Sequence, residues 1–206
     1  MPPTAVLERP IERTKSRSHS PVSPLMDLDG MIHELIADGG PLPSEYALLN
    51  QKLRQLGDAV RADVTKRADV LAYAKDLTKR HFEGSMQAMA LERKYGYSGD
   101  FEVIDGIYRQ KVSTQSHLRR WDLFFHAQAA PIAVRNRKSY FHGLLDQHQP
   151  ESRSGGMRVL DVASGPARDL REWMLDHPKA DVFFDCVDAD VHAIEHAKTL
   201  CQPFSE

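Results

Sequence analysis

Two short stretches of the chain carry the residue types that a nucleotide-binding site needs. Residues 163–167 read Ala-Ser-Gly-Pro-Ala, and side chains this small let the backbone turn sharply and approach a ligand closely. Asp188, Ala189 and Asp190 follow roughly 20 residues later, the spacing at which a carboxylate accepts hydrogen bonds from the hydroxyls of a ribose. Together the stretches predict a backbone cradle beside a ribose-binding acid.

The elements that must position these residues are two predicted strands joined by a helix. Apolar, β-branched runs at residues 157–162 and 182–187 predict strands of a parallel sheet that is buried on both faces. Pro166 suits the first position of the helix, and apolar side chains recur at helical spacing from Leu170 to Met174. A strand, helix and parallel strand of this length form a right-handed βαβ unit.

These motifs resemble those of the class I S-adenosylmethionine (SAM) dependent methyltransferases. VLDVASGPA, which begins at Val159, is similar to their first motif, a strand with an acid that runs into a Gly-x-Gly-x-Gly turn. VDAD, which ends at Asp190, looks like their second motif. Only the central glycine is kept, so it stays open whether the alanines at the other two positions adopt a positive φ. The resemblance implies that SAM is bound by Asp161, Ala163, Ser164, Gly165, Pro166, Ala167, Asp188, Ala189 and Asp190.

The resemblance extends over roughly residues 44–206. GYSGDFEVID, RRWDLFFHAQAAPIAVRNRK and LDVASGPARDL look like a bacterial methyltransferase family whose members include enzymes that esterify 3-hydroxy fatty acids to make quorum signals. It implies methyl transfer from SAM to the carboxylate of a small or fatty-acid-like acceptor. Because a carboxylate is ionised at neutral pH, the reaction needs no general base, and we name no catalytic residue.

Two segments before the strands are candidates for binding the acceptor. Residues 95–108 place aromatic side chains around a two-glycine turn, which fits either a helix cap followed by a new helix or a lid over a ligand. Tyr97 and Asp100 are the candidates there. Residues 117–142 are locally basic, and the forked guanidinium of Arg135 or Arg137 suits a carboxylate. A solvated helix face explains the same basic pattern.

The rest of the chain before the strands is predicted to be helical. Ser44 is expected to cap a long helical region whose apolar seam runs from Tyr46 through Leu53, Val64 and Leu71 to Phe82, loosened at Gly57. The spacing does not separate an internal seam from one that joins two subunits in a homodimer. The expected fold is α/β, with a disordered tail at residues 1–24, an all-α helical cap at 25–150, and the first βαβα unit of a Rossmann-like SAM-binding domain at 157–206.

Other functions are less consistent with the sequence. A nicotinamide-dependent oxidoreductase needs G-x-G-x-x-G, and Arg168 stands where the third glycine would be. His192 to His196 match an H-x-x-E-H zinc pattern, but they follow the predicted ribose-binding acid, so we predict no metal. A non-catalytic helical assembly protein with a methyltransferase remnant stays open.

Composition sets the remaining limits. The formal net charge of −2 does not indicate a nucleic-acid partner. The chain lacks an 18-residue apolar run and an apolar signal core, so we expect a cytoplasmic protein with no membrane span. Cys186 and Cys201 are expected to be reduced. Methyltransferase sheets have about seven strands, so we expect this chain to be the front part of a longer protein and inactive alone.

Overall fold

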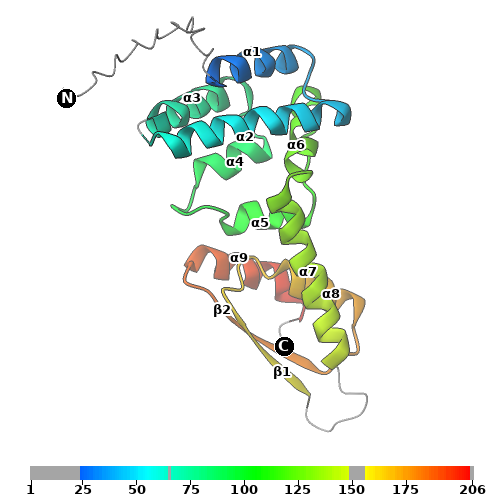
Figure 1. Ribbon diagram of the computed structural model, residues 1–206. Helices are drawn as coiled ribbons and strands as arrows, with labels where there is room; N and C mark the ends of the chain where they lie inside the picture. Colours follow the sequence, from blue (N-terminus) through cyan, green and yellow to red (C-terminus); the bar gives the residue numbers. More distant parts are fainter. Residues whose placement is uncertain (1–23, 65, 149–155, 205–206) are drawn as a thin grey trace, which may run out of the picture.

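The computed structural model describes residues 24–64, 66–148 and 156–204. A layer of helices lies at one end and a small α/β unit at the other, and the long helix α7 (Ala129–His148) runs from the first to the second (Figure 1). The mixture of helices with a parallel sheet confirms the expected α/β class. The predicted tail lies outside the described residues except for Pro24, which begins α1.

The helical layer is built around one apolar cluster. It comprises α1 (Pro24–Ala37), the short 3-10 helix η1 (Pro43–Glu45), α2 (Tyr46–Ala62), α3 (Lys66–His81), α4 (Met86–Glu92) and α6 (Ser116–His126). Phe82 meets Trp121 edge to face with the ring centres 4.8 Å apart. The other buried members are Leu28, Ile32, Leu35, Leu49, Leu77, Leu118 and Phe124.

The predicted long helical region is divided at a different place from the one expected. Gly57 lies inside α2, and the break falls at Asp63, where the backbone turns extended. Val64 is 70% exposed, and Leu53 and Leu71 are also exposed, so the predicted seam is wrong at these positions. Ser44 does not cap the region, because it lies within η1.

The α/β unit follows the predicted element order. Strand β1 (Met157–Val162) pairs in parallel with β2 (Val182–Val187), and Met157 lies opposite Val182. Between them runs α8 (Arg168–Asp176), and α9 (Val191–Cys201) and the 3-10 helix η2 (Gln202–Phe204) follow β2. Both strands have the bounds that the sequence predicts. Cys186 and Cys201 are free thiols.

Within residues 24–64, 66–148 and 156–204, helices cover one face of the sheet and leave the other exposed, which contradicts the prediction of strands buried on both faces. Phe184 and Cys186 pack against Ala167, Leu170 and Ala197 beneath α8 and α9. Side chains of the opposite face are exposed by more than half: Leu160, Val162, Phe183 and Val187. Since α8 and α9 both pack on the same face, the pattern alternates between covered and open positions.

The helical layer and the α/β unit meet through α5 (Phe101–Tyr108) and α7. Asp105 of α5 forms an ion pair with Arg168 at the start of α8, and both side chains are largely buried. Trp173 Nε1 donates a hydrogen bond of 2.8 Å to Asp146 at the end of α7. The ion pair holds α5 beside the carboxyl ends of β1 and β2, where α8 begins, and the Trp173 bond joins the end of α7 to the last part of α8.

None of the helices in residues 24–64, 66–148 and 156–204 combines the length and the hydropathy needed to cross a bilayer.

Candidate functional site

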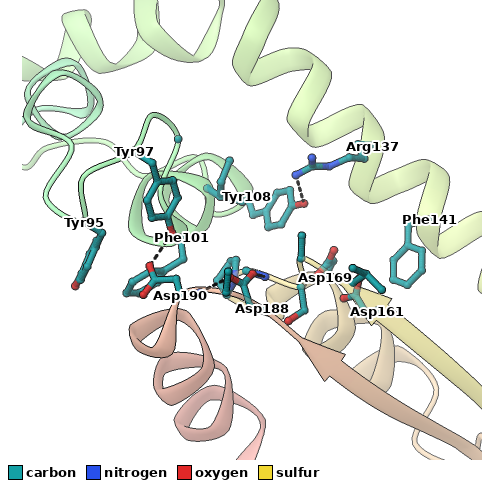
Figure 2. Close-up of a pocket in the computed structure, with 18 of the residues that line it drawn as sticks. Tyr95, Tyr97, Phe101, Tyr108, Arg137, Phe141, Asp161, Asp169, Asp188 and Asp190 are labelled. Carbon is teal, nitrogen blue, oxygen red and sulfur yellow. Dashed lines mark hydrogen bonds between the residues drawn. The ribbon is translucent and has the colours of Figure 1, made fainter.

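A cavity of about 870 Å³ lies between the carboxyl ends of β1 and β2 and the side chains of α5, α7 and the loop before α5. Its volume is within the range of pockets that bind small molecules. Figure 2 shows acids at the ends of the strands facing aromatic side chains from α5, α7 and the loop before α5. Ten of the thirteen predicted binding residues line it: Tyr97, Arg137, Asp161, Ala163, Ser164, Gly165, Pro166, Asp188, Ala189 and Asp190.

The turn after β1 has a left-handed backbone at every second residue. The φ angles are +60° at Ala163, +56° at Gly165 and +51° at Ala167. The open question about the two alanines is thus answered, since both adopt a conformation that usually favours glycine. Alanine tolerates it at a cost of roughly 1 kcal/mol each. Helix α8 begins only at Arg168, so the prediction that Pro166 occupies the first helical position is wrong.

The carboxylate of Asp188 joins the two predicted stretches. Its Oδ2 accepts a hydrogen bond of 2.8 Å from the Gly165 N–H, and its Oδ1 accepts one of 2.8 Å from the Asp190 N–H. The turn after β1 and the acid after β2 therefore face the same crevice. Each oxygen of a carboxylate has two acceptor sites, so Asp188 retains capacity for a ligand hydroxyl.

Tyr97 brings the loop before α5 to the same place. Its hydroxyl donates a hydrogen bond of 2.7 Å to Asp190 Oδ2 (Figure 2), while Asp190 Oδ1 caps α9 by accepting from the His192 N–H at 2.9 Å. The Tyr97 bond lowers the pKa of Asp190. Burial and the neighbouring carboxylate raise the pKa of Tyr97, so its hydroxyl stays protonated at neutral pH.

Two further acids lie close together in the cavity. Burial raises the pKa of Asp161 to about 6, and repulsion from Asp169 adds to the shift while Arg137 opposes it. Burial also raises the pKa of Asp169. Asp161 is therefore mostly ionised at pH 7 and takes up a proton in mildly acidic solution. A cation bound beside this pair would relieve the repulsion between the two carboxylates.

Arg137 reaches the cavity from α7 and donates a 3.3 Å hydrogen bond to the Tyr108 hydroxyl (Figure 2). The hydroxyl of Ser164 is buried in the turn and has no hydrogen-bond partner among the described residues. Ser164 therefore also retains capacity for a ligand.

Three predicted binding residues do not line the cavity. Asp100 is 2% exposed and caps α5 by accepting from the Val103 N–H at 3.0 Å. Arg135 donates to the backbone oxygen of His126 at 2.9 Å. Ala167 is buried in the core beneath the turn. We therefore assign these three side chains to the framework of the fold.

Asp169, Tyr140 and Phe141 also line the cavity and were not predicted from the sequence. Tyr140 and Phe141 lie three and four residues after Arg137, so one face of a helix carries all three. Asp169 directly follows the turn. Helical spacing from Arg137 would have found the two aromatic residues.

The two histidines of the H-x-x-E-H pattern pack against aromatic rings. The ring centre of His192 lies 5.1 Å from that of Tyr95, and that of His196 lies 5.3 Å from that of Phe101. In the part of the chain that the structure describes, no three His, Cys, Asp or Glu side chains are grouped as metal ligands.

Comparisons of the chain with family models, with curated proteins and with solved structures give no match.

Proposed function

We propose that the cavity binds S-adenosylmethionine and that the chain is part of a SAM-dependent methyltransferase. The observation that supports this most is the bond from the Gly165 N–H to Asp188. It fixes a nearly side-chain-free turn and a carboxylate at the adjacent ends of two parallel strands, which is where open α/β sheets bind nucleotides.

The lining residues fit the groups of SAM. Asp188 accepts from the ribose hydroxyls, and the backbone of residues 163–165 approaches the methionine end closely because its side chains are small. Asp161 faces the ammonium group, and Arg137 binds the carboxylate with its forked donors. SAM supplies an electrophilic methyl group, and the protein contributes alignment, for which roughly 7 to 11 kcal/mol is available in well-oriented reactions.

Calorimetric titration with S-adenosylhomocysteine tests the proposal. The wild-type chain should bind it, and Asp188→Ala should weaken binding about tenfold or more, because a hydroxyl bonded to a carboxylate contributes about 1.5 to 3 kcal/mol. Asp185→Ala is the matched control, since Asp185 lies on β2 just before Asp188 but on the exposed face, paired with Arg158. It should leave the affinity unchanged.

The same titration also tests the oxidoreductase, with NADH in place of S-adenosylhomocysteine. Preferential binding of NADH would contradict our proposal. A folded wild-type chain that binds neither ligand would also contradict it. The exposed apolar face with Leu160, Val162, Phe183 and Val187 favours the assembly protein as the second candidate, which a concentration-dependent dimer in light scattering would support.

A further inference from the structure

The charge of the cavity is strongly one-sided. Among the described residues that line it, four carry carboxylates, and Arg137 is the one basic side chain. SAM itself carries a net charge of one positive unit at neutral pH, so a cavity filled with SAM still holds an excess of negative charge. A second ligand with a carboxylate would enter against this field. The four acids are Asp161, Asp169, Asp188 and Asp190.

The wall of the cavity that faces the carboxylates is aromatic, and some of its rings are exposed. Tyr95 and Phe101 pack on each other and on the histidines of α9. Tyr140, in contrast, is 69% exposed and Tyr97 is 40% exposed, so both present ring surface to a ligand. Aromatic faces attract cations, and they do so most strongly where water is displaced.

The same wall already holds one cation in this way. The ammonium of Lys138 lies 5.2 Å from the centre of the Tyr108 ring, within the usual distance for a cation–π contact. Lys138 does not line the cavity, because it pairs with Glu172 of α8. The contact shows that the Tyr108 ring of α5 stabilises one positive charge beside the cavity.

We propose that the methyl acceptor is an amine that is positively charged at neutral pH, held between the carboxylates at the strand ends and the rings of Tyr97 and Tyr140. This inference rests on the proposed function, because it names the acceptor of the same reaction. It differs from the carboxylate acceptor that the family resemblance implies, which the charge of the cavity disfavours.

Methyl transfer from SAM to such an amine balances in atoms and electrons with the groups that are present. The ammonium nitrogen first releases a proton to a cavity carboxylate, which passes it to water, and thereby gains its lone pair. The lone pair attacks the methyl carbon, the carbon–sulfur bond breaks, and sulfur keeps the electron pair of that bond. Asp169 is suited to the proton transfer, because burial raises its pKa and the neighbouring Asp161 is engaged with the ammonium group of SAM. The product is a methylated ammonium ion.

A matched pair of small probes tests the inference. Hexylamine and hexanoate have the same number of carbon atoms and opposite charges, and hexan-1-ol is the neutral reference. Each is titrated at pH 7.5 into the wild-type chain saturated with S-adenosylhomocysteine. We expect hexylamine to bind at least about tenfold more tightly than hexanoate, with the alcohol between them. Equal binding, a preference for hexanoate, or no binding of hexylamine would overturn the inference.

Two variants test the site itself. Asp190→Asn keeps a good cap for α9 and removes one charge, and Tyr140→Leu removes an exposed ring. Each should lower the affinity for hexylamine about threefold or more and leave that for hexan-1-ol nearly unchanged. Asp176→Asn makes the same change of net charge at the exposed end of α8, outside the cavity, and should have no effect. An equal loss of hexylamine affinity in Asp176→Asn would show that the affinity depends on net charge alone, and it would contradict the proposed amine site.

Failure of this inference is distinguishable from failure of the proposed function. If S-adenosylhomocysteine binds and the amine shows no preference, the acceptor class is wrong and the cofactor site stands. If S-adenosylhomocysteine does not bind, the proposed function fails, and methyl transfer to an amine fails with it.

Discussion

Asp188 stabilises the local backbone whether or not a ligand is bound. Its two oxygens accept hydrogen bonds from the N–H groups of Gly165 and Asp190, so the carboxylate holds the turn after β1 and the start of α9 together. A ligand hydroxyl would use the remaining acceptor sites of the same group. Replacement of Asp188 by alanine therefore removes a ligand contact and loosens the turn at once, and the loss of affinity should exceed that of one hydrogen bond.

Asp161 should make the protein less stable at neutral pH and more able to bind its ligand. The folded state raises the pKa of this acid from 3.8 to about 6, so between about pH 4 and 6 the folded chain binds more protons than the unfolded chain. The free energy of unfolding contributed by this group therefore falls as pH rises through that window.

The variant Asp161→Asn should flatten this dependence. We expect it to raise the free energy of unfolding at pH 7, measured by urea denaturation, by an amount that vanishes near pH 4. Its affinity for S-adenosylhomocysteine should fall, because the partner of the ammonium group is lost. Lower stability of the variant at pH 7 would contradict the assignment of burial and repulsion as the cause of the shift.

At the scale of the elements, the strands were predictable and their surroundings were not. Runs of Val, Leu and Phe define β1 and β2, and such runs form strands wherever they pair. The runs are apolar on both faces, and the sequence therefore predicted burial on both, although helices cover only one. The tight turn and the acid after β2 were predictable because βαβ geometry brings the ends of adjacent parallel strands together.

Helix geometry and capping explain why two of the predicted site residues, Arg135 and Asp100, do not line the cavity. Arg135 and Arg137 are two residues apart, and positions with this spacing on a helix point to nearly opposite sides. Only one of them can face the cavity, and nothing in the local pattern says which. Asp100 satisfies the rules for both a ligand contact and a helix cap, and the structure uses it as a cap.

The turn between α1 and η1 offers a sharp test of packing between elements. Gly39 and Gly40 have φ angles of +78° and +103°. A Cβ atom added at Gly40 would lie 2.8 Å from Arg120 Cβ and 3.0 Å from the Trp121 ring. A Cβ atom added at Gly39 would meet open space. Gly39→Ala should therefore cost about 1 kcal/mol of backbone strain. Gly40→Ala should cost about 1 to 3 kcal/mol more, because α6 must move.

Urea denaturation of the two alanine variants gives the comparison directly. Equal losses of stability in both would mean that α6 does not pack against this turn as described. The difference between the variants is more informative than either value, since the two glycines share nearly the same unfolded state.

At the scale of the whole molecule, the cavity forms where α5, α7 and the loop before α5 meet the α/β unit. Its floor comes from β1, β2 and the turn, and its aromatic wall comes from α5, α7 and the loop with Tyr97. The contacts that fix this arrangement lie beside the cavity: the ion pair between Asp105 and Arg168 and that between Lys138 and Glu172. Binding should therefore depend on residues that touch no ligand.

The two tryptophans allow this dependence to be measured, because Trp121 is buried in the helical layer and Trp173 under the sheet. In single-tryptophan variants of the otherwise wild-type chain, Trp121→Phe and Trp173→Phe, the remaining fluorophores should report one common urea transition.

Asp105→Ala removes the close partner of the mostly buried Arg168 and leaves it the longer 4.0 Å contact with Glu172. Loss of one partner of a buried ion pair typically costs about 3 to 5 kcal/mol. Trp173 should then report unfolding at lower urea than Trp121, with weaker binding of S-adenosylhomocysteine. Lys94→Ala, which removes an exposed pair between the loop before α5 and Glu102 of α5, should change stability by less than about 1 kcal/mol. Coincident transitions in Asp105→Ala with unchanged affinity would mean that the ion pair does not couple the layers.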